Sequence, residues 1–120
     1  MNLLDETKFL MHKFNIKADK SLGQNFLINE NVINEIIDKS KVSAEDLIIE
    51  IGPGLGTLTS KLLEKAGKVI SIELDSKMID ILNSRFFQYN NFELINNDVL
   101  KVDLASLIKN NNSFKILKIF

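Results

Sequence analysis

The sequence contains no cysteine and no long apolar run. Without cysteine, the chain has no disulfide framework, no thiolate metal site and no cysteine nucleophile. No stretch approaches the roughly 18 uninterrupted apolar residues that a transmembrane helix needs. Charged residues also interrupt the apolar residues near the N-terminus, which does not resemble a secretory signal. These features lead us to expect a cytoplasmic protein that has no membrane span and no metal site.

The sequence also lacks an excess of positive charge, with a formal net charge of −1 and an isoelectric point near 5.8. Proteins that bind nucleic acid usually carry clustered lysine and arginine, because phosphate contacts dominate their affinity. Lys8, Lys13, Lys17 and Lys20 form a mildly basic segment, but acidic residues dilute it. Composition alone therefore does not support RNA binding, and a solvated surface is the simpler interpretation of this segment.

The length of 120 residues suits about one domain. The spacing of apolar residues predicts helices over residues 1–14, 31–40, 57–66, 76–87 and 104–108. Apolar runs predict strands over residues 47–51, 68–74, 92–95 and 114–120, and residues 15–29 are expected to form an irregular segment. Because strands alternate with helices from residue 47 onward, we expect an α/β fold with about four parallel strands in a doubly wound sheet.

A glycine-rich loop between the first predicted strand and the next helix is the most informative feature. It reads Glu50-Ile51-Gly52-Pro53-Gly54-Leu55-Gly56. Glycines there let the backbone turn tightly and let a ligand approach without a Cβ in the way. Glu73 ends the second strand 21 residues after Gly52, close to the spacing of about 20 at which an acid binds ribose hydroxyls in this topology. Gly52, Gly54 and Glu73 therefore predict a nucleoside site.

The sequence of this loop also indicates which kind of nucleoside ligand it suits. A dinucleotide-binding loop has glycine or alanine where this chain has Thr57, and no Gly-Lys-Ser or Gly-Lys-Thr of a P-loop follows. The acid Glu50 suits a cationic ligand better than a pyrophosphate, and S-adenosylmethionine carries an ammonium and a sulfonium. The residues favour S-adenosylmethionine over NAD. An NAD-dependent oxidoreductase fragment and a glycine-rich turn without any ligand are the alternatives.

A third polar feature, Asn96-Asn97-Asp98, ends the third predicted strand at the same edge of the sheet. Such a turn is more often a solvated loop when it is taken alone. Next to the glycine loop and Glu73, however, Asp98 is placed to accept a hydrogen bond from the exocyclic amine of an adenine.

These segments together resemble the ribosomal RNA adenine N(6)-dimethyltransferases, specifically the bacterial small-subunit type. The resemblance runs from about residue 20 to residue 102 and is carried by Lys20-Ser21-Leu22-Gly23-Gln24-Asn25-Phe26-Leu27, Glu50-Ile51-Gly52-Pro53-Gly54-Leu55-Gly56-Thr57-Leu58-Thr59, Ile72-Glu73-Leu74-Asp75 and Asn97-Asp98-Val99-Leu100. It implies a Rossmann-like methyltransferase fold that uses S-adenosylmethionine to dimethylate two adjacent adenines in the 3′-terminal hairpin of small-subunit (16S) ribosomal RNA. The expected partner is the immature 30S subunit. Large-subunit adenine methyltransferases, which usually carry a different glycine loop, are the alternative within the family.

The resemblance also implies the cofactor contacts. Asn25 and Leu27 are expected to cover the methionine end of the cofactor, although simple packing would explain Leu27 equally well. Gly52, with Gly54 beside it, is expected to pass beneath the cofactor, while Glu73 binds the ribose and Asp98 the adenine.

The chain departs from the family after the fourth predicted strand, where the family has Asn-Leu-Pro-Tyr. In the family, this tetrad holds and stacks on the flipped-out target adenine, and it does not occur in these 120 residues. We therefore name no catalytic residue. The expected organisation is an N-terminal extension over residues 1–40 and the first half of a methyltransferase domain over residues 41–120, without the helical C-terminal RNA-binding domain. We expect a truncated or frameshifted product with little or no transferase activity, and a non-catalytic binding module is the alternative.

Overall fold

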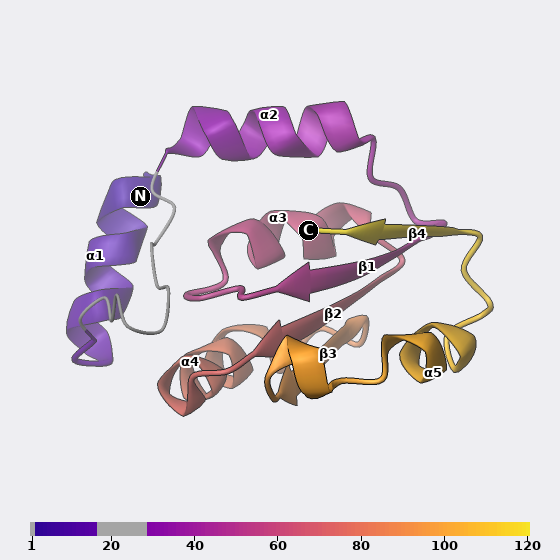
Figure 1. Cartoon of the computed structure of the whole chain (residues 1–120). Helices are drawn as coiled ribbons and strands as arrows, with labels where there is room; N and C mark the ends of the chain where they lie inside the picture. The colour runs from indigo at the N-terminus through magenta and orange to yellow at the C-terminus, as the bar shows by residue number, and fades with distance from the viewer. Residues whose placement is uncertain (1, 17–28) are drawn as a thin grey trace.

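The computed structural model of the chain describes residues 2–16 and 29–120. At its centre is a four-stranded sheet in the order β3-β2-β1-β4, and all three strand pairs are parallel (Figure 1). From β1 the chain moves outward to β2 and β3 and then crosses back to β4 on the other side of β1. The predicted doubly wound topology is thereby confirmed. The strands are β1 (Asp46–Ile51), β2 (Lys68–Glu73), β3 (Phe92–Asn96) and β4 (Ile116–Ile119).

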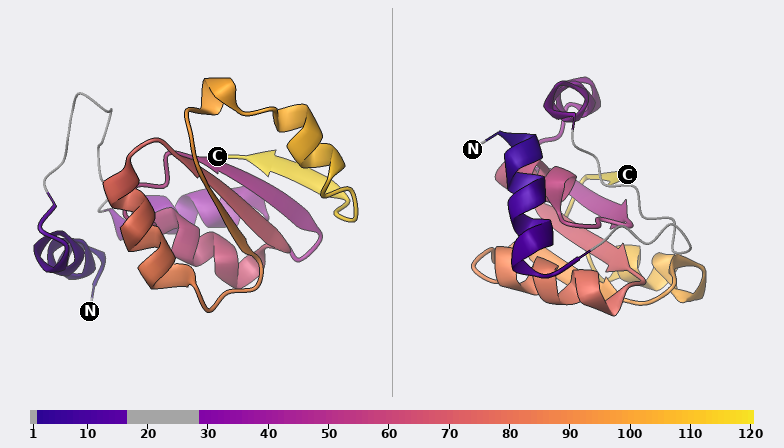
Figure 2. Two further views of the ribbon diagram at one scale, coloured as in Figure 1. Left: turned by 90° about the horizontal axis from the view of Figure 1, so that it is seen from below. Right: turned by 90° about the vertical axis from the view of Figure 1, so that its left-hand side faces the viewer.

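The helices connect the strands and extend the chain at its N-terminal side. They are α1 (Leu3–Lys13), α2 (Glu30–Ser40), α3 (Thr57–Lys65), α4 (Ser76–Phe86), α5 (Leu104–Lys109) and the short 3₁₀ helix η2 (Val99–Lys101). Figure 2 shows α3 and α4 on one face of the sheet and α5 on the other. Most of these helices are N-capped by a polar side chain that accepts a hydrogen bond from a backbone N–H of the first turn. The capping residues are Asn2, Asn29, Asp75, Asp98 and Asp103.

The predicted boundaries agree closely with the structure, with two differences. The last strand begins at Ile116 rather than at residue 114, because the N–H of Phe114 still donates to the carbonyl of Asn111 in the preceding turn. The helix η2 was not expected; it forms because Asp98 caps it. The predicted irregular segment lies mostly outside the described residues.

The core is formed by the two inner strands and the helices that cover them. Apolar residues of β1 and β2 are buried on both faces of the sheet, as their nearly continuous apolar runs predict: Leu47, Ile48, Ile49, Val69, Ile70 and Ile72. Each buried side chain of this size stabilises the fold by about 1.5–3 kcal/mol relative to an exposed one. Leu10 of α1 and Ile37 of α2 belong to the same hydrophobic cluster as Ile48 and Val69.

The first helix stands at the end of the molecule toward which the strands point (Figure 1). Thr7 and Leu10 on its inner face are buried. Helix α1 is therefore packed beside the sheet edge at which the glycine loop leaves β1. No helix within residues 2–16 and 29–120 combines the length and the hydrophobicity needed to cross a membrane.

Candidate functional site

The predicted site residues of β1, β2 and β3 meet along one edge of the sheet. The parallel register sets Ile51 beside Ile72 and Glu73 beside Asn96. Beyond the strand ends, the N–H of Gly52 donates to the carbonyl of Ile72 at 2.9 Å, and the N–H of Asn97 donates to the carbonyl of Glu73 at 3.1 Å. The glycine loop, Glu73 and the turn that contains Asp98 therefore lie next to one another.

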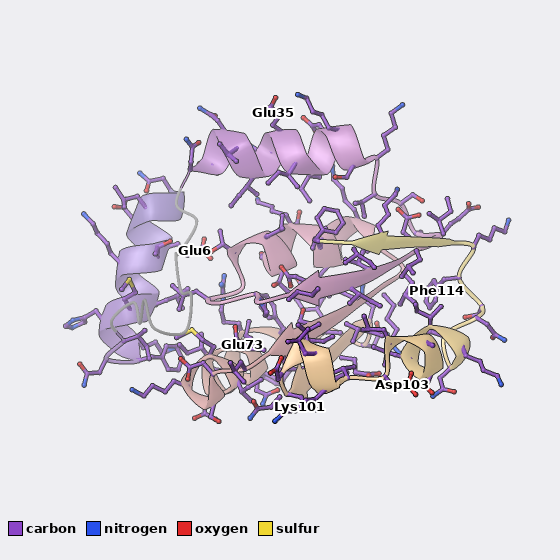
Figure 3. The ribbon with its side chains drawn as sticks, in the orientation of Figure 1. Glu6, Glu35, Glu73, Lys101, Asp103 and Phe114 are labelled. Carbon is purple, nitrogen blue, oxygen red and sulfur yellow. The ribbon has the colours of Figure 1, made fainter. Side chains whose placement is uncertain are left out.

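The side chain of Glu73 faces the glycine loop from the end of β2 (Figure 3). It is 7% exposed; Oε1 accepts the N–H of Gly54 at 3.1 Å, and Oε2 accepts the N–H of Asp75 at 2.9 Å. A carboxylate has about four acceptor positions, so both oxygens keep capacity for further donors. Glu73 can thus hold the loop and still accept hydrogen bonds from a pair of hydroxyl groups.

Three glycines of the loop adopt positive φ angles, which residues with a side chain rarely do: +67° at Gly52, +59° at Gly54 and +86° at Gly56. Their surroundings differ. A Cβ built on Gly52 meets no atom within 4 Å, whereas a Cβ on Gly56 would lie 2.5 Å from the ring of Phe86. A glycine is therefore required at position 56 for packing on α4. At Gly52, by contrast, no described residue fills the space that a side chain would occupy, so a ligand can approach the backbone there.

Helix α3 begins directly after Gly56 without a side-chain cap. The N–H groups of a first helical turn have no partner inside the helix and carry partial positive charge. In this position they suit a negatively charged group, such as the carboxylate of an amino acid.

Glu50 lies beneath the loop, where it is 3% exposed. Its Oε1 accepts the hydroxyls of Thr59 on α3 at 2.5 Å and of Ser71 on β2 at 2.8 Å. Burial raises the pKa of Glu50 against the opposing effect of these two hydrogen bonds, and the negative charge of Glu73 raises it further. The sequence suggested Glu50 as the complement of a cationic ligand; the structure gives it hydroxyl partners inside the protein, so any influence on a ligand acts through its charge.

Asp98 lies half-buried at the same edge. Its Oδ1 accepts the N–H of Leu100 at 2.9 Å and so caps η2, and its own N–H donates to the side chain of Asn97. One carboxylate oxygen of Asp98 is thus used locally. The remaining predicted contacts, Asn25 and Leu27, lie outside the described residues.

The structure adds apolar residues that the sequence analysis did not assign to the site. Leu74 follows Glu73 directly and is 55% exposed, and Leu100 of η2 is 89% exposed. Leu74 lies next to Glu73 and Leu100 lies two residues after Asp98 in the chain, and apolar side chains exposed beside polar groups are typical of binding surfaces. The signal in the sequence was Leu74 directly after the acid Glu73, and we interpreted this leucine only as the last residue of the predicted strand.

Comparisons with known proteins identify relatives of this chain. Residues 15–119 match the sequence profile of the family described as ribosomal RNA adenine dimethylase. The chain is 50% identical over 111 residues to Ribosomal RNA small subunit methyltransferase A of Clostridium botulinum (strain Langeland), a match that covers 92% of this chain and 40% of that protein. The protein of the same description from Alkaliphilus metalliredigens is 46% identical over 114 residues, 95% of this chain and 40% of its own length. The chain therefore spans about 40% of the length of these relatives.

Solved structures show the same fold. A dimethyladenosine transferase from Plasmodium falciparum is similar with a TM-score of 0.61 and 40% identity over 65% of this chain and 29% of its own. The 23S ribosomal RNA methyltransferase ErmE has a TM-score of 0.61 and 24% identity over 79% of this chain and 47% of its own. An RNA methyltransferase from Salinibacter ruber in complex with S-adenosyl-L-homocysteine has a TM-score of 0.61 and 13% identity over 78% of this chain and 60% of its own. The last two are similarities of fold alone.

Proposed function

Because the chain belongs to the ribosomal RNA adenine dimethylase family, we propose that it forms the S-adenosylmethionine-binding part of an adenine N(6)-dimethyltransferase of small-subunit ribosomal RNA. One observation carries the proposal: the buried Glu73 carboxylate faces the glycine loop and accepts the N–H of Gly54 at the carboxyl edge of a parallel sheet. Ligands of open α/β sheets bind along this edge. The identity of about half to small-subunit methyltransferases favours that target over the large subunit.

The residues at the edge fit the parts of the cofactor. Glu73 can accept hydrogen bonds from the two ribose hydroxyls. Because no described atom lies within 4 Å of a Cβ built on Gly52, the cofactor can pass close to the main chain there. Gly54 keeps the loop against Glu73, and Asp98 accepts from the adenine amine. The exposed side chain of Leu74 offers an apolar surface for the adenine ring. Asn25 and Leu27 are proposed, on the resemblance alone, to cover the methionine end.

When bound, S-adenosylmethionine supplies a methyl group that is activated by its sulfonium charge. The chain's own residues bind and orient this group. The negative charge of Glu73 favours a cationic ligand beside the loop, and the uncapped start of α3 favours the ligand's carboxylate.

The proposed reaction of the family is dimethylation of two adjacent adenines in the 3′-terminal hairpin of 16S ribosomal RNA, on immature 30S subunits in the cytoplasm. The tetrad that holds the target base is not among these 120 residues. We therefore assign cofactor binding to this chain and name no residue that touches the adenine. A chain of these residues is expected to bind the cofactor and to leave immature small subunits unmethylated, and radiolabelled methyl transfer measures the second point.

Calorimetric titration with S-adenosylhomocysteine tests the site. We expect the wild-type chain to bind it and the Glu73→Ala variant to bind about 100-fold more weakly, because two hydrogen bonds to a charged acceptor are lost. Glu93→Ala is the matched control, since it removes an acid of the neighbouring strand that pairs with Lys68. Unchanged affinity after Glu73→Ala would disprove the ribose contact. A wild-type chain that binds NAD instead would disprove the assigned cofactor class.

A further inference from the structure

Arg85, near the end of α4, joins three separate parts of the chain. Its Nη1 donates to the carbonyl oxygen of Leu55 in the glycine loop, and its Nη2 donates to Oε1 of Glu6 on α1. The guanidinium also lies over the ring of Phe86, with its carbon 5.0 Å from the ring centre. The sequence analysis assigned no role to Arg85 or to Glu6.

The position of Arg85 is unusual for a charged residue, because its side chain is only 14% exposed. Burial lowers the pKa of Arg85, and the charge and the hydrogen bond of Glu6 oppose this effect. A buried guanidinium group is tolerated when its N–H donors have acceptors. In Arg85, one Nη atom donates to a backbone carbonyl and the other to a carboxylate. Glu6, which is 37% exposed, lies on the inner side of α1, toward the sheet (Figure 3).

Two neighbouring residues of α4 shape two neighbouring residues of the loop. Arg85 holds the carbonyl of Leu55, and the ring of Phe86 occupies the space that a Cβ on Gly56 would need. The side chain of Leu55 is itself buried at 2% exposure. The second half of the glycine loop is thus formed against the last turn of α4.

The first half of the loop is held from the opposite side by Glu73, through the N–H of Gly54. These two hydrogen bonds to the loop differ in whether the ligand also uses the same side chain. Glu73 is the residue to which we assign the ribose, so its contact with Gly54 must be shared with the ligand. Both hydrogen-bond acceptors of Arg85, on Leu55 and Glu6, belong to the protein, so its contact with the loop does not depend on the ligand.

We propose that Arg85 is a positioning residue that couples α1 to the glycine loop, so that helix and loop keep the cofactor-binding conformation as one unit. The ligand named here rests on the proposed function, whereas the coupling itself is a property of the free chain. Loss of Arg85 releases the Leu55 carbonyl and the Glu6 carboxylate together. The loop then samples other conformations that its three glycines permit, and α1 loses its ion pair with α4 while Leu10 stays in the core.

Amide hydrogen exchange of the free chain, compared between Arg85→Met and Lys68→Met, tests the coupling. Lys68 is the matched control, because it is 25% exposed, pairs with Glu93 at 3.2 Å and donates to Asn111 at 2.7 Å at the opposite end of β2. Both variants are expected to lower the melting temperature. Only Arg85→Met is expected to increase exchange in residues 3–13 and 54–60, by about tenfold or more. Equal exchange of these segments in the two variants would overturn the proposal.

Titration with S-adenosylhomocysteine supplies the second measurement. Arg85→Met is expected to bind it about tenfold more weakly than Lys68→Met, and Arg85→Lys, which keeps the charge but not the planar fork, is expected to fall between them. Should Arg85→Met not fold, Glu6→Gln is used, and faster exchange limited to α1 without any change in the loop would overturn the coupling. If the wild-type chain does not bind S-adenosylhomocysteine, the proposed function fails, and the exchange comparison alone decides the coupling.

Discussion

The two ends of strand β1 each bury a carboxyl group, and their surroundings shift its pKa in opposite directions. At the amino end, Asp46 is 0% exposed, and its Oδ2 accepts Nζ of Lys118 at 2.7 Å and the N–H of Ser43 at 2.9 Å. Burial raises the pKa of Asp46, but the hydrogen bonds and the charge of Lys118 outweigh burial, and the pKa is lowered overall. The amino end therefore favours the charged form.

At the carboxyl end, Glu50 is almost as deeply buried but has hydroxyl partners, Thr59 and Ser71, in place of a cation. Burial dominates there, and the nearby Glu73 adds a like charge, so the pKa of Glu50 is raised. Buried charge without an opposite charge reduces stability, and such groups occur preferentially at functional sites. The amino end of β1 therefore favours a charged carboxylate, and the carboxyl end, where we propose the cofactor site, disfavours one.

Of the substitutions at the two ends of β1, we expect Gly67→Ala at the amino end to have the largest effect. A Cβ on Gly67 would lie 2.4 Å from the carbonyl oxygen of Ala44 and 2.5 Å from the ring of Phe114. Because a backbone atom is one of the obstacles, the free energy of unfolding should fall by about 3 kcal/mol or more. Urea denaturation followed by circular dichroism measures the change.

The control for this variant is Gly52→Ala at the carboxyl end, where a Cβ meets no described atom and only the positive φ is unfavourable. Here we expect about 1 kcal/mol of destabilisation and a roughly tenfold weaker binding of S-adenosylhomocysteine. The comparison between the two ends breaks down if Gly67→Ala weakens binding more than Gly52→Ala does at equal folded fraction.

An intermediate effect is expected from Lys118→Met, which leaves the buried Asp46 without its cation. The cost should be about 2 kcal/mol at pH 7, because Lys118 is itself 26% exposed and partly hydrated. The lowered pKa of Asp46 means that the ion pair stabilises the fold above the pKa of an unfolded aspartate and loses this effect as the pH falls through the lower folded value. The difference between variant and wild type should therefore shrink in acid, below about pH 4. A difference that stays constant down to pH 2 would contradict the assignment.

The smallest effect, of opposite sign, is expected from Glu50→Gln. A glutamine keeps an acceptor for Thr59 and Ser71 but carries no charge, so the variant should gain about 1 kcal/mol of stability at pH 7. A carboxyl group with a raised pKa destabilises the fold as the pH rises from its unfolded pKa through its folded pKa. The gain should thus be absent near pH 4 and present at neutral pH, as thermal melts at both values would show. A loss of stability at pH 7 would contradict this prediction, because it would mean that the surrounding groups stabilise the charged form of Glu50.

Much of the local structure follows from the sequence. Nearly continuous apolar runs such as residues 47–51 predict strands buried on both faces, and spaced apolar residues predict the helices between them, because these periodicities depend only on neighbouring residues. The meeting of Gly52 with Glu73 was also predictable, since parallel strands bring their carboxyl ends to one edge. The cofactor assignments made on this basis, including those of Asn25 and Leu27, stay predictions.

The order of the elements, the glycine loop and the acid that faces it can all be predicted from the amino-acid sequence. The side chains that surround them could be identified only in the folded chain: Glu50 binds Thr59 and Ser71, Asp46 pairs with Lys118, and Arg85 links Glu6 to Leu55. These contacts join residues as many as 79 positions apart. They depend on how helices and strands pack in three dimensions, and no periodicity along the chain encodes the direction in which a single side chain will point.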